Sequence, residues 1–307
     1  MNISKNLKYF FILPAILSVL SIFALVSFGL KPGIDLSGGS LLQVSYPEGR
    51  PPVEQVRALV EKLQFGEIRV QPTGEAGYIL RQRDLSVVEK NQLEAVLGGL
   101  GPIHEDQFTS VGPVLGEELM RKAWIAIVLV VLSTILFIAF AFRRTGDPEK
   151  EKEGIASWKY GVVAVLTLLH DILIPAGLFA FLGFVSGAEV DALFIVALLT
   201  ILGISINDTI VVFDRIRENL RLNKESHKHE AFESVVGRSI SQTLARSIST
   251  SLTVVIVLLA LYFVGPIATK DFALTLIVGM IAGTYSSIFL ASPMLVVWER
   301  WSAHKKN

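Results

Sequence analysis

The sequence has 307 residues, of which 51% are hydrophobic and 18% are charged, and its formal net charge is zero. A zero net charge gives no overall attraction to nucleic acid, and the absence of cysteine excludes disulfides, thiolate metal sites and cysteine nucleophiles. The apolar residues gather in blocks of about 20 residues, which is the length that a helix needs to cross a bilayer. The composition therefore indicates a helical membrane protein.

Six apolar blocks predict six transmembrane helices. The first block follows Lys5 and Lys8, but it is too long for the apolar region of a signal peptide, so we interpret it as an uncleaved first span. The predicted spans are residues 10–30, 124–142, 160–183, 192–213, 244–264 and 272–298.

Residues 31–118 differ in kind from the spans, because they alternate short strand-like and helix-like patterns. Within 40–46, for example, Leu42, Val44 and Tyr46 fall on one face of a strand. The order β-α-β-β-α-β is that of a ferredoxin-like α+β domain. Its strands are predicted at 40–46, 67–70, 78–82 and 104–111, its helices at 51–63 and 86–100, and the turn between the second and third strands at Pro72, Gly74 and Gly77.

Lysine and arginine in the loops predict the orientation, because they concentrate on the cytoplasmic side. The segments 143–159, 214–241 and 300–307 are rich in these residues, whereas the opposite short loops hold only Lys270. Three parts are therefore predicted. Residues 1–30 hold a cytoplasmic N-terminus and the first span, 31–118 form a periplasmic domain, and 119–307 hold the other five spans with cytoplasmic loops 143–159 and 214–241.

Asp208 is an ionisable residue inside the fourth span, which by default marks a functional site. Arg246 lies at a similar depth in the fifth span, so an ion pair is geometrically feasible. The pair could simply hold two helices together. Alternatively it could relay protons, because burial favours the neutral carboxyl and arginine favours the charged form. Polar neighbours on the two spans are Ser205, Asn207, Thr209, Ser249 and Thr250.

Two other features of the spans are notable. His170 and Asp171 lie near the middle of the third span, where they are either a hydrogen-bonded packing pair or part of a proton path or of interhelical gating. Gly279 and Gly283 form a small-residue stripe that predicts close helix packing.

Motifs for other chemistry are missing from the sequence. We interpret His227 and His229 as part of a solvated loop, so no metal site is predicted. No Walker, Rossmann or hydrolase motif occurs, so nucleotide-driven or enzymatic chemistry has no support.

Five stretches of the sequence resemble motifs of the SecD/SecF family. Residues 33–39, Gly-Ile-Asp-Leu-Ser-Gly-Gly, resemble its Gly-Ile-Asp-Phe-x-Gly-Gly signature with leucine in place of phenylalanine, and residues 111–119 resemble its junction motif. His170-Asp171 is similar to its third-span pair. Residues 205–219 and 242–247 are similar to the SecF branch rather than to SecD.

The resemblance implies a fold, partners and an energy source. The six spans would form one half of an RND-type transmembrane unit in the bacterial cytoplasmic (inner) membrane, with SecD supplying the other half. The pair would assist the SecYEG channel in exporting unfolded polypeptide, with YajC and YidC as further partners. A proton gradient, acting through Asp208 and Arg246, would drive movement of the periplasmic domain without a cofactor.

Two alternatives remain open from the residues. The chain could be half of an RND-like exporter of small molecules or lipids, although such an exporter is expected to have two six-span halves and larger outer domains. It could also be a purely structural assembly subunit.

Overall fold

The computed structural model describes residues 3–143, 157–226 and 230–304, and the chain divides into two compact units. One unit comprises residues 32–124 and 189–192, and the other comprises residues 1–31, 125–188 and 193–307. Parts of both predicted cytoplasmic loops, including His227 and His229, lie outside the described residues.

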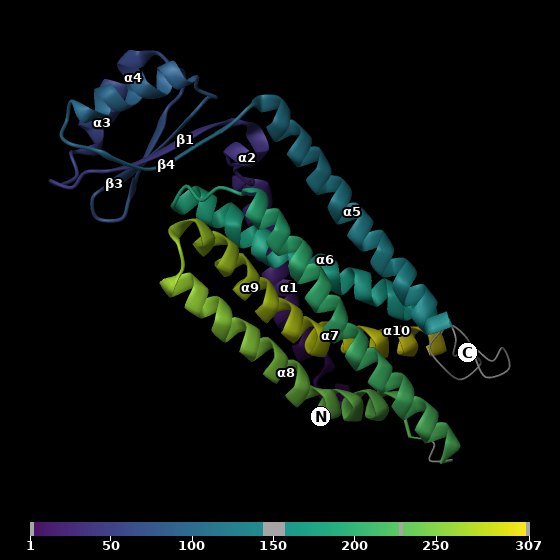
Figure 1. The fold of residues 1–307 in the computed structure, drawn as a ribbon. Coiled ribbons are helices and arrows are strands. Elements are labelled where there is room, and N and C mark those ends of the chain that lie inside the picture. The colour runs from purple at the N-terminus through teal and green to yellow at the C-terminus, as the bar shows by residue number, and fades with distance from the viewer. Residues whose placement is uncertain (1–2, 144–156, 227–229, 305–307) are drawn as a thin grey trace. The chain divides into compact units, whose positions relative to one another are not determined.

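The first unit is an α+β domain with one four-stranded antiparallel sheet in the order β2-β3-β1-β4. Helices α3 and α4 cover one face of this sheet (Figure 1). The predicted β-α-β-β-α-β order of a ferredoxin-like domain is thereby confirmed. The elements are a short helix α2 (Ile34–Ser37), β1 (Gly39–Ser45), α3 (Val53–Val60) with a 3-10 turn (Glu61–Leu63), β2 (Arg69–Thr73), β3 (Gly77–Gln82), α4 (Val87–Gly98) and β4 (His104–Val111).

Alternation along β1 builds the core of this domain. Leu42 and Val44 are fully buried and Tyr46 is 1% exposed, so the predicted face is the one that meets the helices. They pack in one cluster with apolar residues of α3 and α4, among them Val56 and Leu93. Burial of these apolar side chains is the main force that holds α3 and α4 on the sheet.

The hairpin between β2 and β3 differs from the prediction. Pro72 was predicted to form the turn, but β2 continues through it to Thr73, and Pro72 pairs with Tyr78 of β3. The reason is the position of β2 at the edge of the sheet, where a proline without an N–H leaves no partner unsatisfied.

Six helices in the described part of the chain are long and apolar enough to cross a membrane, which agrees with the six predicted spans. Several extend beyond the apolar blocks. In particular, α5 begins at Pro113, a residue suited to the first turn of a helix. The helices are α1 (Ile3–Phe28), α5 (Pro113–Arg143), α6 (Ser157–Val185), α7 (Ala192–Glu225), α8 (Phe232–Val264) and a last composite helix.

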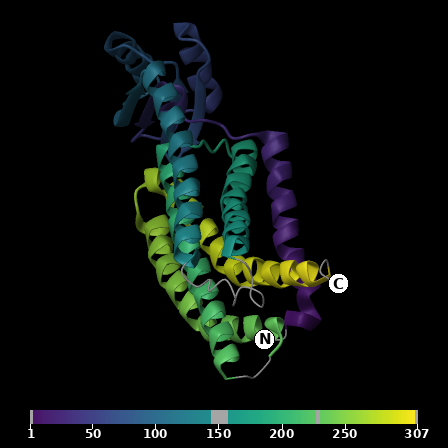
Figure 2. The same cartoon turned by 90° about the vertical axis from the view of Figure 1, so that its right-hand side faces the viewer.

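The last span is interrupted, whereas the apolar block predicted one span over residues 272–298. It consists of α9 (Lys270–Ser286), a π-helical turn (Ser287–Ala291) and α10 (Ser292–His304). α10 leaves the direction of α9 in both views (Figures 1 and 2). Pro293 explains the break, because it has no N–H to donate to the Phe289 carbonyl and so cannot continue the α-helical ladder.

Candidate functional site

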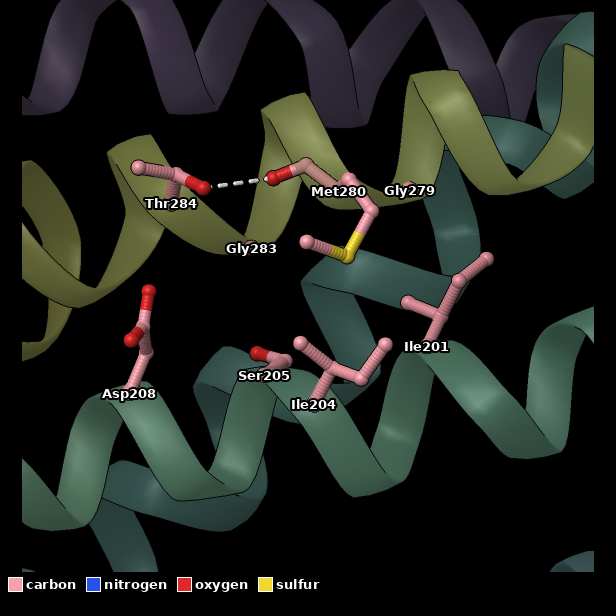
Figure 3. A pocket seen from close by; sticks show the side chains of 8 residues that line it. All are labelled: Ile201, Ile204, Ser205, Asp208, Gly279, Met280, Gly283 and Thr284. Carbon is pink, nitrogen blue, oxygen red and sulfur yellow. Dashed lines mark hydrogen bonds between the residues drawn. The ribbon is translucent and has the colours of Figure 1, made fainter. Parts of the chain in front are cut away.

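Asp208 lies on α7, where its side chain is buried. Figure 3 shows Asp208 and Ser205 pointing from α7 toward α9, at Gly283 and Thr284. Beside them is a cavity of about 10 Å³, which is about the space that one water molecule needs. The cavity is lined by Ile201, Ile204, Ser205, Asp208, Gly279, Met280, Gly283 and Thr284.

Two glycines of α9 permit this close approach. A Cβ atom on Gly279 would overlap the side chain of Ile201, and one on Gly283 would lie 3.1 Å from Ser205 Cβ. Small residues at such positions allow two helix backbones to lie close together. The small-residue stripe therefore also sets the width of the space beside Asp208.

Asp208 has no hydrogen bond and no ion pair within 4.0 Å to any residue that the structure describes. The charge of Arg246 acts on it from α8, but the Arg246 side chain is exposed. Ser249 and Thr250 are exposed on the same helix. Within the described residues, Arg246 therefore acts on Asp208 through its charge and forms no ion pair with it. The face of α8 that carries Arg246, Ser249 and Thr250 is exposed.

A continuous hydrogen-bonded chain links three helices close to Asp208. The Ser205 hydroxyl of α7 donates to Asp171 Oδ2 of α6. The other carboxylate oxygen, Oδ1, lies 3.0 Å from His170 Nδ1, and His170 Nε2 lies 2.7 Å from the Tyr285 hydroxyl of α9. Asp171 is fully buried and His170 is 6% exposed. The structure therefore brings His170, Asp171 and Ser205 into one network.

Further hydroxyl contacts flank the network. Thr209 of α7 lies 3.0 Å from Ser287, the first residue of the π-helical turn. Thr284 donates to the Met280 carbonyl and lies 2.5 Å from Ser251 of α8. These contacts tie α7 and α8 to α9 on either side of the buried carboxylate.

Asn207 lies away from Asp208. Its side chain is exposed, and it lines an open groove of about 450 Å³ between α5 and α7. The two neighbours in sequence thus face different surroundings, as residues one apart on a helix do.

Sequence reasoning missed Tyr285, Thr284, Ser287 and Ser251 as members of the polar layer. Tyr285 follows Gly283 by two residues and therefore points to a different neighbour than the glycine stripe does. The only signal in the sequence was one tyrosine in an apolar span. Its hydrogen-bond partner cannot be identified until the packing of the helices is known.

The arrangement has the groups that proton exchange would require. An intramembrane carboxylate without a fixed cation beside it, next to space for a water molecule, can take up and release a proton. No group of histidine and carboxylate side chains in the described residues is arranged to hold a metal ion.

Six spans, a ferredoxin-like domain after the first of them and an intramembrane carboxylate define a membrane protein of RND type. Comparison with known families then gives two matches. Residues 92–301 match the model "Protein export membrane protein SecD/SecF, C-terminal", and residues 23–46 match the "SecD/SecF GG Motif". The chain belongs to the SecD/SecF family of protein export membrane proteins.

Relatives and solved structures agree with this assignment. The chain is 41% identical to the protein translocase subunit SecF of Thermobaculum terrenum, over 94% of this chain and 91% of the relative. It is 36% identical to SecF of Anaerolinea thermophila, over 97% of this chain and 94% of the relative. The crystal structure of SecDF from Thermus thermophilus, described as a translocon-associated membrane protein, matches with a TM-score of 0.82 and 33% identity.

That match covers 98% of this chain but only 39% of the SecDF chain. A second structure, SecDF in a super-membrane-facing form, matches with a TM-score of 0.69 over 40% of its chain. This chain therefore corresponds to one part of a protein that, in Thermus thermophilus, carries both the SecD and the SecF parts in one polypeptide. The comparisons thus point to a SecD-type partner.

Proposed function

We propose that this chain pairs with a SecD-type subunit and assists SecYEG-dependent export of unfolded polypeptide, drawing on the proton gradient across a bacterial cytoplasmic membrane. YajC and YidC are further partners in this proposal. Both termini lie in the cytoplasm and the α+β domain lies in the periplasm, as the distribution of lysine and arginine indicates. Family membership supports the export role.

The single observation that supports proton coupling is the environment of Asp208. It is a buried carboxylate in a membrane helix, with no bonded partner among the described residues and with the charge of Arg246 acting on it. A buried carboxylate in a membrane helix is unfavourable, and by default its presence indicates a functional site. We infer that Asp208 takes up a proton from one side and releases it to the other, and that Arg246 stabilises the charged state.

The exposed face of α8 supports the role of a second subunit. Arg246, Ser249 and Thr250 are polar, lie in a membrane helix and are open on this chain. Polar side chains at this depth are unfavourable in lipid and are expected to face protein or water. A SecD-type half that covers α8 would enclose Arg246 and complete the proton path.

The α+β domain is connected to Asp208 through α7. The first residue of this helix, Ala192, belongs to the α+β unit, where its N–H donates to Asp35 Oδ2 at 3.4 Å. The Gly33 N–H donates to the Val190 carbonyl at 2.8 Å. Asp208 lies further along the same continuous helix. A shift of α7 on protonation would therefore act directly on residues 189–192, which belong to the α+β unit.

The available energy is sufficient for such a shift. One proton that crosses 100 mV releases about 2.3 kcal/mol. At about 1.4 kcal/mol for each factor of ten, this biases a two-state equilibrium by about 50-fold. One proton per cycle could thus change the position of the domain substantially.

Replacement of Asp208 tests the proposal. Asp208→Asn keeps the size of the side chain and removes its charge, and we expect it to abolish gradient-dependent export while assembly with the SecD-type subunit stays normal. Export is measured in membrane vesicles with and without a proton gradient. The matched control is Asp214→Asn, the same change at an exposed position of α7.

Two outcomes would contradict the proposal. Unchanged gradient-dependent export in Asp208→Asn would assign the residue a structural role only. Equal losses in Asp208→Asn and Asp214→Asn would show that the effect is not specific to the buried carboxylate.

A further inference from the structure

The hydrogen-bonded chain from Tyr285 to Ser205 contains a second group that can bind a proton. His170 and Asp171 are adjacent on α6, both buried and bonded to each other, and each has one further polar atom bonded to a residue of another helix. We propose that the His170–Asp171 pair is a second proton-binding unit of the membrane domain, positioned by Tyr285 and Ser205. This inference rests on the proposed proton-driven function and adds a site to it.

The donors and acceptors in the chain admit one arrangement when Asp171 is ionised and His170 is neutral. The Asp171 carboxylate can only accept, so it takes a hydrogen bond from Ser205 on Oδ2 and one from His170 Nδ1–H on Oδ1. His170 Nε2 then carries the lone pair and accepts from the Tyr285 hydroxyl at 2.7 Å. The geometry therefore assigns the Nδ1–H tautomer to His170.

The charge of this arrangement makes it a proton acceptor. With His170 neutral the pair carries one negative charge, and no lysine or arginine within the described residues contacts it. A buried net charge in a membrane is unfavourable. One added proton on Nε2 gives an imidazolium beside a carboxylate, which is net neutral.

The surroundings of the pair hold few other titratable groups. The α9 helix presents Tyr285, and the α7 helix presents Ser205, with Asp208 one turn further. Residues 9–28 of α1, which packs closely on α6 at Gly177, contain no charged residue. The charge of Arg246 acts on Asp208. On the helices bonded to the pair, the titratable groups nearest to it are thus Tyr285 on α9 and Asp208 on α7.

Protonation of Nε2 has a structural consequence on α9. The new Nε2–H must donate, so Tyr285 must turn its own hydroxyl hydrogen away and accept instead. Its neighbour Thr284 lines the cavity beside Asp208, and Ser287 bonds to Thr209 of α7. The two proton-binding positions are therefore connected through the last turn of α9 and the first residue of the π-helical segment.

Nitrogen-15 NMR of the histidine side chains tests the proposal on the full chain in lipid nanodiscs. The chain has five histidines, so a variant with His104→Gln, His227→Gln, His229→Gln and His304→Gln leaves His170 as the one imidazole. We expect the Nδ1–H tautomer at high pH, and conversion to the doubly protonated ring on acidification. If the fourfold variant does not fold, the same signal is identified in the wild-type chain by its loss in His170→Gln.

The tyrosine hydroxyl provides the second arm. In Tyr285→Phe, we expect the midpoint of this conversion to move by about one pH unit and gradient-driven export to fall at least about threefold. The matched control, Tyr262→Phe, removes the hydroxyl of another tyrosine in a membrane helix and is expected to change neither quantity. A merely structural role of Tyr285 would alter export without moving the midpoint.

The outcomes separate this proposal from the previous one. An Nε2–H tautomer, a ring that stays neutral throughout the titration, or a midpoint unmoved in Tyr285→Phe would each overturn the second site. These measurements are made without a gradient and without export. Their results therefore do not depend on whether Asp208→Asn abolishes gradient-dependent export.

Discussion

Gly279 of α9 and Ile201 of α7 are in direct contact, so that even a methyl group on Gly279 would overlap the isoleucine side chain. The same approach of α9 to α7 places Gly283 against Ser205 and bounds the cavity at Asp208. In a lipid environment, where apolar burial does not drive helices together, such close packing is a principal source of association.

Gly279→Ala is therefore expected to destabilise the membrane domain by about 1 to 3 kcal/mol, the usual cost of overpacking. Gly203→Ala is the matched control, because Gly203 lies in α7 with no atom within 4 Å of an added Cβ. Alanine there should be neutral, or stabilising by up to about 1 kcal/mol through its better helix propensity. Thermal unfolding of the purified full chain, followed by tryptophan fluorescence, compares the two. Equal unfolding midpoints would refute the packing argument.

The paired glycines of the SecD/SecF motif have a physical explanation in this structure. Gly38 has φ +76° and Gly39 has φ +134°, values that other residues rarely adopt. A Cβ atom on Gly38 would lie 2.6 Å from Pro113 Cα, and one on Gly116 would lie 2.5 Å from the Gly38 nitrogen. The signature after α1 and the junction motif at the start of α5 are thus two sides of one backbone-to-backbone contact.

We expect Gly38→Ala to destabilise the α+β domain by more than backbone strain alone, which costs about 1 to 2 kcal/mol. Gly49→Ala isolates the strain, because Gly49 has φ +113° but no atom within 4 Å of an added Cβ. Gly98→Ala is the control without strain or overlap. Gly98 is the last residue of α4, has no positive φ and has no atom within 4 Å of an added Cβ. Hydrogen exchange of the β1 amides in the full chain should show the highest protection in Gly98→Ala, lower protection in Gly49→Ala and the lowest in Gly38→Ala. Equal protection in the last two would contradict the contact.

The cap of α4 predicts a pH dependence of the α+β domain. Hydrogen bonds from Arg83, and then from Ser86, lower the pKa of Glu89 from its ordinary value to about 2. Ser86 and Glu89 form a capping box at the start of this helix. Because the folded-state pKa lies below the unfolded one, Glu89 stabilises the fold above about pH 4.3, and this stabilisation is lost as the pH falls toward 2.

Hydrogen exchange of the α4 amides, corrected for the intrinsic pH dependence, should therefore show less protection at pH 3 than at pH 6. In Glu89→Gln, protection at pH 6 should already be reduced, and this part of the pH dependence should disappear. Glu48→Gln changes an exposed glutamate after β1 and serves as the control. Retention of the full pH dependence in Glu89→Gln would show that another carboxylate is responsible.

Local patterns predicted most of the fold. The alternation of Leu42, Val44 and Tyr46 identified both a strand and its buried face, and 20-residue apolar blocks identified the spans. Errors arose where tertiary context decided the outcome. Pro72 lies in an edge strand, which tolerates a missing N–H, and Pro293 breaks the last span although the apolar block runs through it.

The candidate site was predictable only where a charged or ionisable residue interrupts an apolar run. A carboxylate in an apolar run is visible in the sequence, so Asp208 was identified, as were His170 and Asp171. A hydroxyl group in such a run is a weaker signal, because serine and threonine also occur in membrane helices as packing residues. Ser205 and Thr209 were therefore named only as neighbours of Asp208, and Tyr285 was missed. Tyr285 acquires its role only when the packing of α9 places it against His170.

The link before α7 is tied into the α+β unit. Glu189 Oε2 lies 3.0 Å from Arg81 Nε of β3, and both side chains are largely buried. Arg69 of β2 lies 3.9 Å from the other carboxylate oxygen. The proposed coupling of the domain to Asp208 passes through this segment, so its attachment can be tested separately.

Glu189→Gln is expected to release residues 189–192 from the domain and to raise amide exchange at Val190 and Ala192 by about tenfold. Its physical reason is that a largely buried arginine loses its charged partner, which costs more than an exposed pair does. Glu67→Gln is the matched control, because Glu67 also pairs with Arg69 but is 80% exposed, and such a surface pair contributes little. Gradient-driven export should fall in Glu189→Gln and stay unchanged in Glu67→Gln. Raised exchange at 190–192 with full export activity would show that the segment is attached to the domain but does not transmit the movement of α7.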